Sequence, residues 1–368
     1  MELENIREQK TANQRTPGAL LSETLAAVKP LDKEAMAAGA RRWSSLAKPL
    51  EGLGVLENTI TRICGIKGKE LFSLDRKILL VMCADNGVVQ EGISQTDSSV
   101  TAVVTNNFAS GRTSACLMSQ VAQVEVCAVD VGVKEDTRVF MEKAARGTGN
   151  LAKEPAMSRE VMLRTVETGI RLARECKEQG FQILLTGEMG IGNTTTSSAM
   201  ACALLKAPVE EMTGRGAGLS GEGLKHKQEV IRKALAFHRL EEAGPLEILE
   251  KVGGLDIAAL TGIFLGGAAC RLPVVMDGFI SAVAALTACR LAPLAGEYIL
   301  ASHCSREPGM KRVLRELGKE PVLFAGMKLG EGTGAVALMP LLEMALKVYR
   351  EMPTFDGIQI TPYEAFTD

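Results

Sequence analysis

Five short apolar runs, each followed at once by glycine or a polar side chain, constrain the fold of this chain most. They are RKILLVMCADNGV, QVEVCAVDVGV, GFQILLTGEMGIGN, LPVVMDGF and EYILASHCS. Alanine- and leucine-rich helical patterns, such as residues 158–179 and 222–243, lie between these runs. Strands that are apolar throughout and alternate with helices indicate a parallel sheet buried on both faces. We therefore predict an α/β fold, a parallel sheet with helices on both of its faces.

The glycine-rich and polar clusters of the chain are expected at one edge of this sheet. Ligands of open parallel sheets bind at the carboxyl ends of the strands. The clusters occupy residues 187–196, 213–227, 302–318 and 328–340. We therefore expect them to form one composite site.

Charge and hydropathy exclude two classes of partner. The net charge is −2 with basic and acidic residues well mixed, whereas nucleic-acid binding needs a concentrated basic face. The most apolar stretch lies between Asp277 and Arg290 and is shorter than the ~20 residues that cross a bilayer, so it is predicted to be a buried helix. With a charged N-terminus and no apolar signal segment, a cytoplasmic protein is expected.

Cysteine and histidine give no metal-ligand pattern. The nine cysteines include no C-x-x-C pair, and they are expected to be reduced, buried, small apolar side chains. Of the three histidines, His238 lies on a helical pattern and is expected on the surface, while His303 follows a predicted strand. No metal and no cofactor are predicted.

The glycine-rich loop at 187–196 resembles a phosphate cradle. Gly187, Gly190 and Gly192 lie between a predicted strand and a predicted helix, and the free N–H groups of a helix N-terminus bind anions. Asn193 occupies the position of the P-loop lysine, and Thr195 that of the third Rossmann glycine, so neither nucleotide motif is complete. A tight turn capped by Asn193 and its neighbour is the alternative.

Two further clusters have both a functional and a structural interpretation. The loop at 213–227 carries Arg215, Lys225 and Lys227, and is either a cationic part of the site or a solvated loop. Glu331 lies in a Gly-Glu-Gly-Thr-Gly turn before an apolar helix. It is either a partner of the helix dipole or a general base whose pKa is raised by desolvation.

Several strings together resemble one enzyme family. They are GEMGIGNTTTSSA, VGGLDIAALTG, DGFISAVAAL, SHCSREPG and LGEGTGAVALMPLL, in the same order along about residues 20–350. They resemble the nicotinate-nucleotide–dimethylbenzimidazole phosphoribosyltransferases of cobamide biosynthesis. The resemblance implies transfer of the 5-phosphoribosyl group from nicotinate mononucleotide to a lower-ligand base, giving an α-ribotide and nicotinate.

The resemblance also implies an architecture. It consists of a Rossmann-like large domain, residues 45–335, and a small helical domain formed by both chain ends, residues 1–44 and 336–368. A homodimer, or a heterodimer with a paralogue, is expected, with no metal needed.

The resemblance assigns roles to individual residues. Glu331 corresponds to the catalytic carboxylate of the family. Glu188 belongs to the phosphate and ribose site, where it is expected to interact with the ribose or with the acceptor. That site comprises Glu188, Met189, Gly190, Ile191, Gly192, Asn193, Lys227 and Ser305.

One segment departs from the family pattern, and it belongs to the predicted pocket for the acceptor base. Asn86 replaces a histidine, Thr96 begins a Thr-Asp pair in place of Ser-Pro, and Val104 aligns with a glutamine of the base pocket. We therefore predict an acceptor other than dimethylbenzimidazole alone, such as a phenol, another benzimidazole or a purine. The alternative function is a non-catalytic or co-catalytic subunit of a heterodimeric enzyme of the same pathway.

Overall fold

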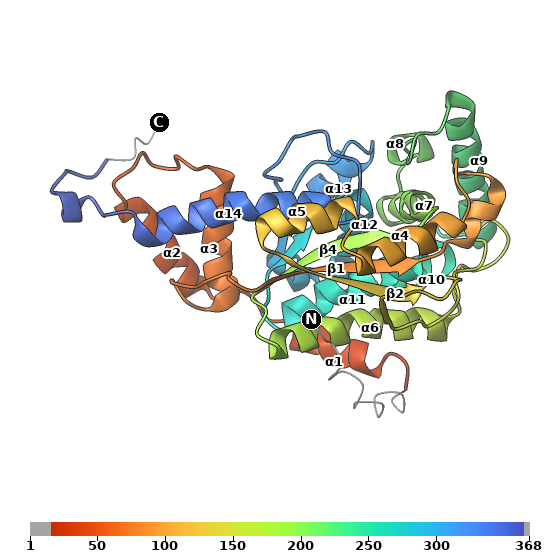
Figure 1. The fold of residues 1–368 in the computed structure, drawn as a ribbon, viewed down its shortest axis with the longest axis horizontal. Coiled ribbons are helices and arrows are strands. Elements are labelled where there is room, and N and C mark those ends of the chain that lie inside the picture. Colours follow the sequence, from red (N-terminus) through yellow and green to blue (C-terminus); the bar gives the residue numbers. More distant parts are fainter. Residues whose placement is uncertain (1–15, 364–368) are drawn as a thin grey trace.

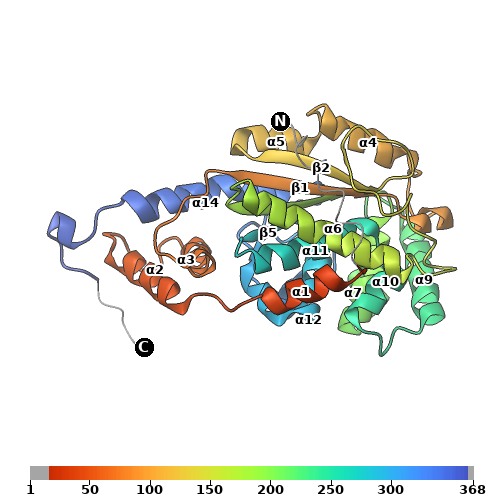
Figure 2. The same cartoon turned by 90° about the horizontal axis from the view of Figure 1, so that it is seen from below.

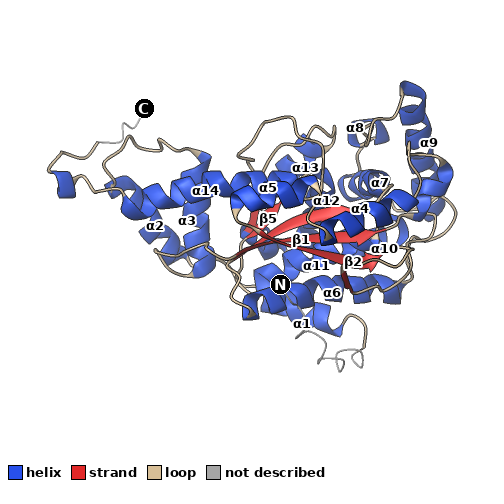
Figure 3. Cartoon of the chain, in the orientation of Figure 1, coloured by secondary structure: helices blue, strands red, loops and turns tan. Residues whose placement is uncertain are grey.

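The computed structural model describes residues 16–363, which are built around a six-stranded sheet (Figures 1 and 3). The strands are β1 (Lys77–Ala84), β2 (Glu125–Gly132), β3 (Phe140–Met141), β4 (Ile183–Met189), β5 (Val274–Met276) and β6 (Ile299–Ala301). Their order is β3-β2-β1-β4-β5-β6, and every pair is parallel. The predicted parallel sheet is confirmed. Sequence patterns do not predict β3, because two residues are too few to show a period.

Helices cover both faces of the sheet, as predicted (Figure 2). Successive side chains of a strand point to opposite faces, so even-numbered residues 78–82 of β1 join one apolar core and odd-numbered residues 79–83 the other. The first core is completed by α1 (Ala19–Ala27), α6 (Arg159–Glu178), α7 (Asn193–Leu205), α8 (Val209–Met212), α9 (Gly221–His238), α10 (Pro245–Val252), α11 (Leu255–Ala269), α12 (Phe279–Leu291) and α13 (Met310–Glu316). The second is completed by α2 (Lys33–Ser45), α3 (Val55–Lys67), α4 (Ser99–Ala109), α5 (Ser114–Ala122) and α14 (Thr333–Glu351). Short 3₁₀ helices occupy Gly87–Glu91, Pro293–Tyr298 and Asp356–Ile358.

Helices from the two ends of the chain lie together at one end of the molecule. Figures 1 and 2 show α2 and α3 beside the C-terminal part of α14. The rings of Trp43 and Tyr349 pack with their centroids 4.9 Å apart, which joins α2 to α14. The predicted division into 45–335 and 1–44 with 336–368 stays a prediction, and its residues 1–15 and 364–368 lie outside the described part.

Glycines allow α6 and α11 to pack closely under the sheet. A Cβ atom on Gly169 of α6 would overlap the carbonyl oxygen of Ala259, and one on Gly262 of α11 would overlap that of Val166. Since both obstacles are backbone atoms, neither can move away without shifting a helix.

We expect Gly262→Ala to lower the free energy of unfolding by about 1–3 kcal/mol, the usual cost of overpacking a core. Gly221→Ala is a matched control, because a Cβ on Gly221 would meet nothing within 4 Å. Urea denaturation of both variants measures the difference. Equal midpoints for the two variants would contradict the close packing of α6 and α11.

The prediction that His238 lies on the surface is wrong. His238 is buried on α9 and its Nε2 lies 2.8 Å from the carbonyl oxygen of Leu151. It follows Ala234 by four residues, so both face the core, and burial lowers the pKa of His238. All nine cysteines are unpaired, as predicted, but they are not all buried, since Cys127, Cys270, Cys289 and Cys304 are partly exposed. No helix within residues 16–363 has the length and apolar character needed to cross a membrane.

Candidate active site

A pocket opens at the carboxyl edge of the sheet. Its wall is formed by residues 93–95, 188–194, 215–219, Lys227, 277–281, His303, Ser305, Glu307 and 328–331. All four predicted clusters contribute to this wall, so they form one composite site. Within residues 16–363, no three His, Cys, Asp or Glu side chains are grouped to hold a metal ion.

The glycine-rich loop turns directly from β4 into α7. Gly192 adopts φ 95° and caps the helix, with no side chain bonded at this cap. The alternative in which Asn193 caps the helix is therefore wrong. The Asn193 side chain points inward instead, donating hydrogen bonds from Nδ2 to Glu188 and to Asp256 (3.0 Å).

Glu188 and Asp256 form a buried pair of carboxyl groups under the loop. Glu188 is 7% exposed on β4, and Asp256 is fully buried in the first turn of α11. Burial, together with the charge of Asp256, raises the pKa of Glu188 to about 8. Burial also raises the pKa of Asp256 to about 6, against the hydrogen bond from Asn193. At neutral pH Glu188 is therefore mostly protonated, which removes a negative charge from the phosphate cradle.

These shifts give a pH dependence of stability with a definite sign. Between the ordinary glutamate pKa of about 4.3 and the folded value of about 8 for Glu188, the folded state binds more protons than the unfolded state. Stability therefore falls as pH rises through this range. Because Glu188→Gln removes this titration, its stability relative to the starting protein should rise from pH 5 to pH 8 in urea denaturation. A difference that does not vary with pH would contradict the raised pKa.

Positive charge reaches the start of α7 from α9. Lys227 is buried, and its Nζ donates a hydrogen bond to Oγ1 of Thr194 (2.8 Å). Burial lowers the pKa of Lys227 to about 8, while nearby Glu307 acts in the opposite direction. The buried Oγ of Ser305 has no hydrogen-bond partner among the described residues. An ammonium group, a free hydroxyl and a helix N-terminus together suit a phosphate.

Glu331 lies on the pocket wall in an unusual backbone conformation. Its φ is 62°, between Gly330 at 85° and Gly332 at 87°, all in the left-handed region that favours glycine. Its Oε2 accepts a hydrogen bond from the amide of Ala115 at the start of α5 (3.3 Å). Burial raises its pKa, and the Ala115 amide opposes that shift. A carboxylate of this kind, half-buried and only weakly bonded, is suited to accept a proton.

The three residues predicted for the acceptor pocket are not on the pocket wall. Asn86 is buried against Gly190 and Gly192 of the glycine-rich loop, and its side-chain oxygen and nitrogen have no hydrogen-bond partner among residues 16–363. Thr96 is exposed, and Val104 on α4 is half-buried and packs against the second core. Ile93, Ser94 and Gln95 of the same segment line the pocket instead. The role of Asn86, Thr96 and Val104 toward the acceptor stays a prediction.

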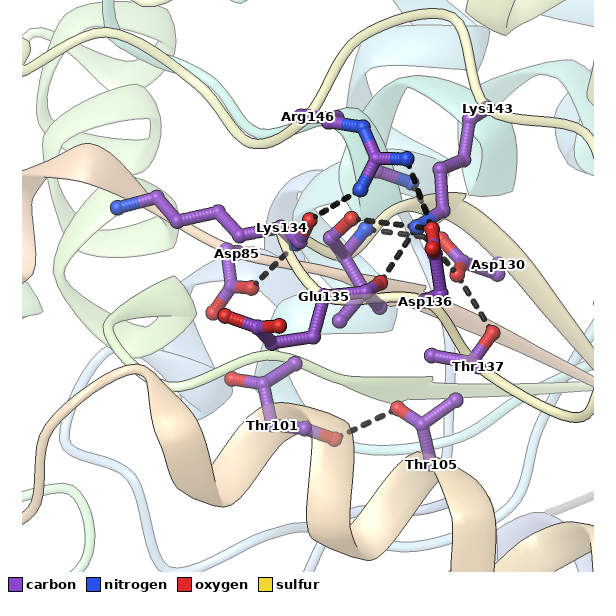
Figure 4. Close-up of polar contacts among 12 residues, drawn as sticks. Asp85, Thr101, Thr105, Asp130, Lys134, Glu135, Asp136, Thr137, Lys143 and Arg146 are labelled. Carbon is purple, nitrogen blue, oxygen red and sulfur yellow. Dashed lines mark hydrogen bonds and ion pairs between the residues drawn. The ribbon is translucent and has the colours of Figure 1, made fainter.

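A second polar network lies at the ends of β1 and β2 (Figure 4). Asp130 accepts hydrogen bonds from the amides of Gly132 (3.1 Å) and Val133 (2.8 Å) and pairs with Lys143 (3.1 Å). It also accepts one from Thr137 (2.6 Å). Since this network satisfies the carboxylate and lies off the pocket wall, it holds the strand ends in place.

A family model described as phosphoribosyltransferase, DBI_PRT, matches residues 28–360. The chain therefore belongs to this family of enzymes.

Its similar relatives carry a more specific name. The nicotinate-nucleotide–dimethylbenzimidazole phosphoribosyltransferase of Acetivibrio thermocellus is 44% identical over 348 residues, covering 94% of this chain and 99% of the relative. The protein of the same name from Halalkalibacterium halodurans is 42% identical over 339 residues, covering 91% and 95%. The crystal structure of CobT from Thermus thermophilus superposes with a TM-score of 0.85 at 38% identity, covering 90% of this chain and 100% of that one.

Proposed function

We propose that this chain transfers the 5-phosphoribosyl group of nicotinate mononucleotide to a lower-ligand base. The products are nicotinate and an α-ribotide for the cobamide nucleotide loop. The observation that carries the proposal is the position of the Glu331 carboxylate on the same pocket wall as Lys227, Ser305 and the start of α7. Glu331 is suited to take a proton, and Lys227, Ser305 and the amides at the start of α7 are suited to hold a phosphate.

The reaction follows from these positions. The amides at the start of α7, with Lys227 and Ser305, hold the 5-phosphate, and Glu188 contacts the ribose or the acceptor. The acceptor attacks C1′ as the C1′–N bond to the pyridinium breaks, and the electron pair neutralises the leaving ring. Glu331 takes the proton that the acceptor loses. Positioning supplies most of the acceleration, and proton transfer adds about 10²- to 10⁴-fold.

The acceptor is proposed to be a base other than dimethylbenzimidazole alone. The altered segment with Asn86, Thr96 and Val104 supports this, because the phosphate and catalytic motifs keep the family pattern. For a phenolic acceptor, Glu331 deprotonates a hydroxyl group in place of a ring nitrogen. The proposal further includes a homodimer or a heterodimer with a paralogue, in the cytoplasm.

A competition assay tests this function. The purified chain, with and without a paralogue, is given nicotinate mononucleotide and equal amounts of dimethylbenzimidazole, phenol, p-cresol and adenine. Mass spectrometry of the ribotides identifies the acceptor used. Clear preference for dimethylbenzimidazole would contradict the altered acceptor, and activity only with the paralogue would favour a co-catalytic subunit. No ribotide under either condition would contradict the function itself.

A further inference from the structure

We infer that Asp277 is a positioning residue for Glu331, because it anchors the first turn of α14 to the end of β5. The inference rests on the proposed function, in which Glu331 is the base. Asp277 itself need not contact the reacting atoms.

The anchor consists of two hydrogen bonds to backbone amides. Asp277 follows β5 directly and is 3% exposed. Its Oδ1 accepts hydrogen bonds from the N–H groups of Gly334 (2.8 Å) and Ala335 (3.0 Å). A carboxylate at a helix N-terminus is stabilised by these free amides and by the helix dipole. The start of α14, and the turn that carries Glu331 just before it, are thereby fixed to the sheet.

His303 completes the anchor from the end of β6. Its Nδ1 lies 4.0 Å from Oδ1 of Asp277 and 3.0 Å from Oγ of Ser302. Its ring lies against Gly334 so closely that a Cβ atom at 334 would overlap it. The ends of two strands therefore hold one helix turn, and glycine at 334 is required for that contact.

The backbone before α14 needs such an anchor. Glu331 has φ 62°, and a non-glycine residue held in a sparsely populated region costs of order 1–3 kcal/mol. The turn is closed by the hydrogen bond from the Thr333 amide to the Gly330 carbonyl (3.0 Å). Ala115 bonds the Glu331 side chain from one side, and Asp277 holds the helix from the other. Without Asp277, the turn is free to relax and the carboxylate to leave its place.

Asp277 also acts on Glu331 through its charge. Burial raises the pKa of Asp277, while His303 and the α14 amides favour its ionised form. Its negative charge in turn raises the pKa of Glu331. The charged or titratable side chains on the pocket wall are Glu188, Arg215, Lys227, Asp277, His303, Glu307, Lys328 and Glu331 itself.

The test is Asp277→Asn in the full chain, assayed across pH with nicotinate mononucleotide and the acceptor base that the competition assay identifies. We expect kcat to fall by about 10²-fold, the cost of a misplacement of about 1 Å, with KM for nicotinate mononucleotide nearly unchanged. Because the neutral amide no longer raises the pKa of Glu331, the acid limb of the kcat profile should move to lower pH. A residue with only a structural role would not move this limb.

Asp130→Asn is the matched control. Asp130 (Figure 4) is also a buried carboxylate near a strand end that accepts hydrogen bonds from two amides. It is not among the residues that line the pocket. We expect Asp130→Asn to be less stable than the starting protein and to have the same acid limb in its profile of kcat against pH.

The results separate the proposed function of the chain from the positioning role of Asp277. If the unsubstituted chain gives no ribotide with any base, the proposed function fails. If it is active and Asp277→Asn keeps either its kcat or the acid limb of its kcat profile, only the inference fails. Parallel loss of nicotinate mononucleotide binding would also overturn it. If Asp277→Asn does not unfold cooperatively, Asp277→Ser is assayed in its place, and misfolding of both variants would assign Asp277 to folding and overturn the inference.

Discussion

Glu331→Gln is expected to lower kcat by about 10²- to 10⁴-fold, the usual contribution of a general base. The amide keeps the size of the side chain and its ability to accept the hydrogen bond from Ala115, but it does not take a proton at neutral pH. Binding of nicotinate mononucleotide should stay nearly unchanged, because Lys227 and Ser305 hold the phosphate in the proposed complex. Steady-state rates and calorimetry measure the two effects separately.

A suitable control for this variant is Glu210→Gln. Glu210 is an exposed glutamate paired with Arg232 and lies off the pocket wall, so its substitution should leave kcat unchanged. If Glu331→Gln turned over at a rate close to that of the starting protein, Glu331 would not be the base.

Lys227→Met should weaken the binding of nicotinate mononucleotide more than any other single substitution in the cradle. Methionine fills the space of the buried stem but removes the ammonium group. Loss of charge-assisted hydrogen bonds worth about 1.5–3 kcal/mol corresponds to an increase in Kd of roughly 10- to 100-fold. Lys225→Met is the control, because Lys225 is exposed two residues earlier on α9, and its substitution should leave Kd unchanged.

The same lysine gives the binding a pH dependence. The pKa of Lys227 is lowered to about 8, so the ammonium group is present below this value and lost above it. Affinity for the phosphate should therefore fall as pH rises beyond about 8, and ionisation of Glu188 over the same range acts in the same direction. Calorimetry of the Lys227→Met variant should show a weaker dependence. An equal dependence in both proteins would assign the effect to another group.

The strands and the edge that carries the site are predictable from sequence because both depend on local patterns. Continuous apolar runs show where β1, β2 and β4 lie, and the glycine or polar residues after them mark the carboxyl ends. Even β5, with three residues, is recognised from the Asp-Gly pair that follows it. This pair contains Asp277, so the sequence shows a carboxylate at the end of β5. It does not show that this carboxylate binds the amides of Gly334 and Ala335 on α14.

What sequence patterns do not supply is the direction of a side chain across long separations. Asn193 looks like a helix cap, but its amide points inward, because Glu188 and Asp256 are buried beneath it and need a donor. Likewise, no pattern connects Ala115 on α5 to Glu331. Such contacts depend on the packing of elements that are far apart in the chain.

The proposed reaction is transfer of a phosphoribosyl group from nicotinate mononucleotide to an acceptor in this pocket. The most direct test is to incubate the purified chain with nicotinate mononucleotide and the base it prefers, quench the reaction at several times, and quantify nicotinate and ribotide together. We expect equal amounts of the two at every time point, and Glu331→Gln should slow the formation of both by the same factor. Nicotinate released without ribotide would show hydrolysis in place of transfer and would contradict the proposed reaction.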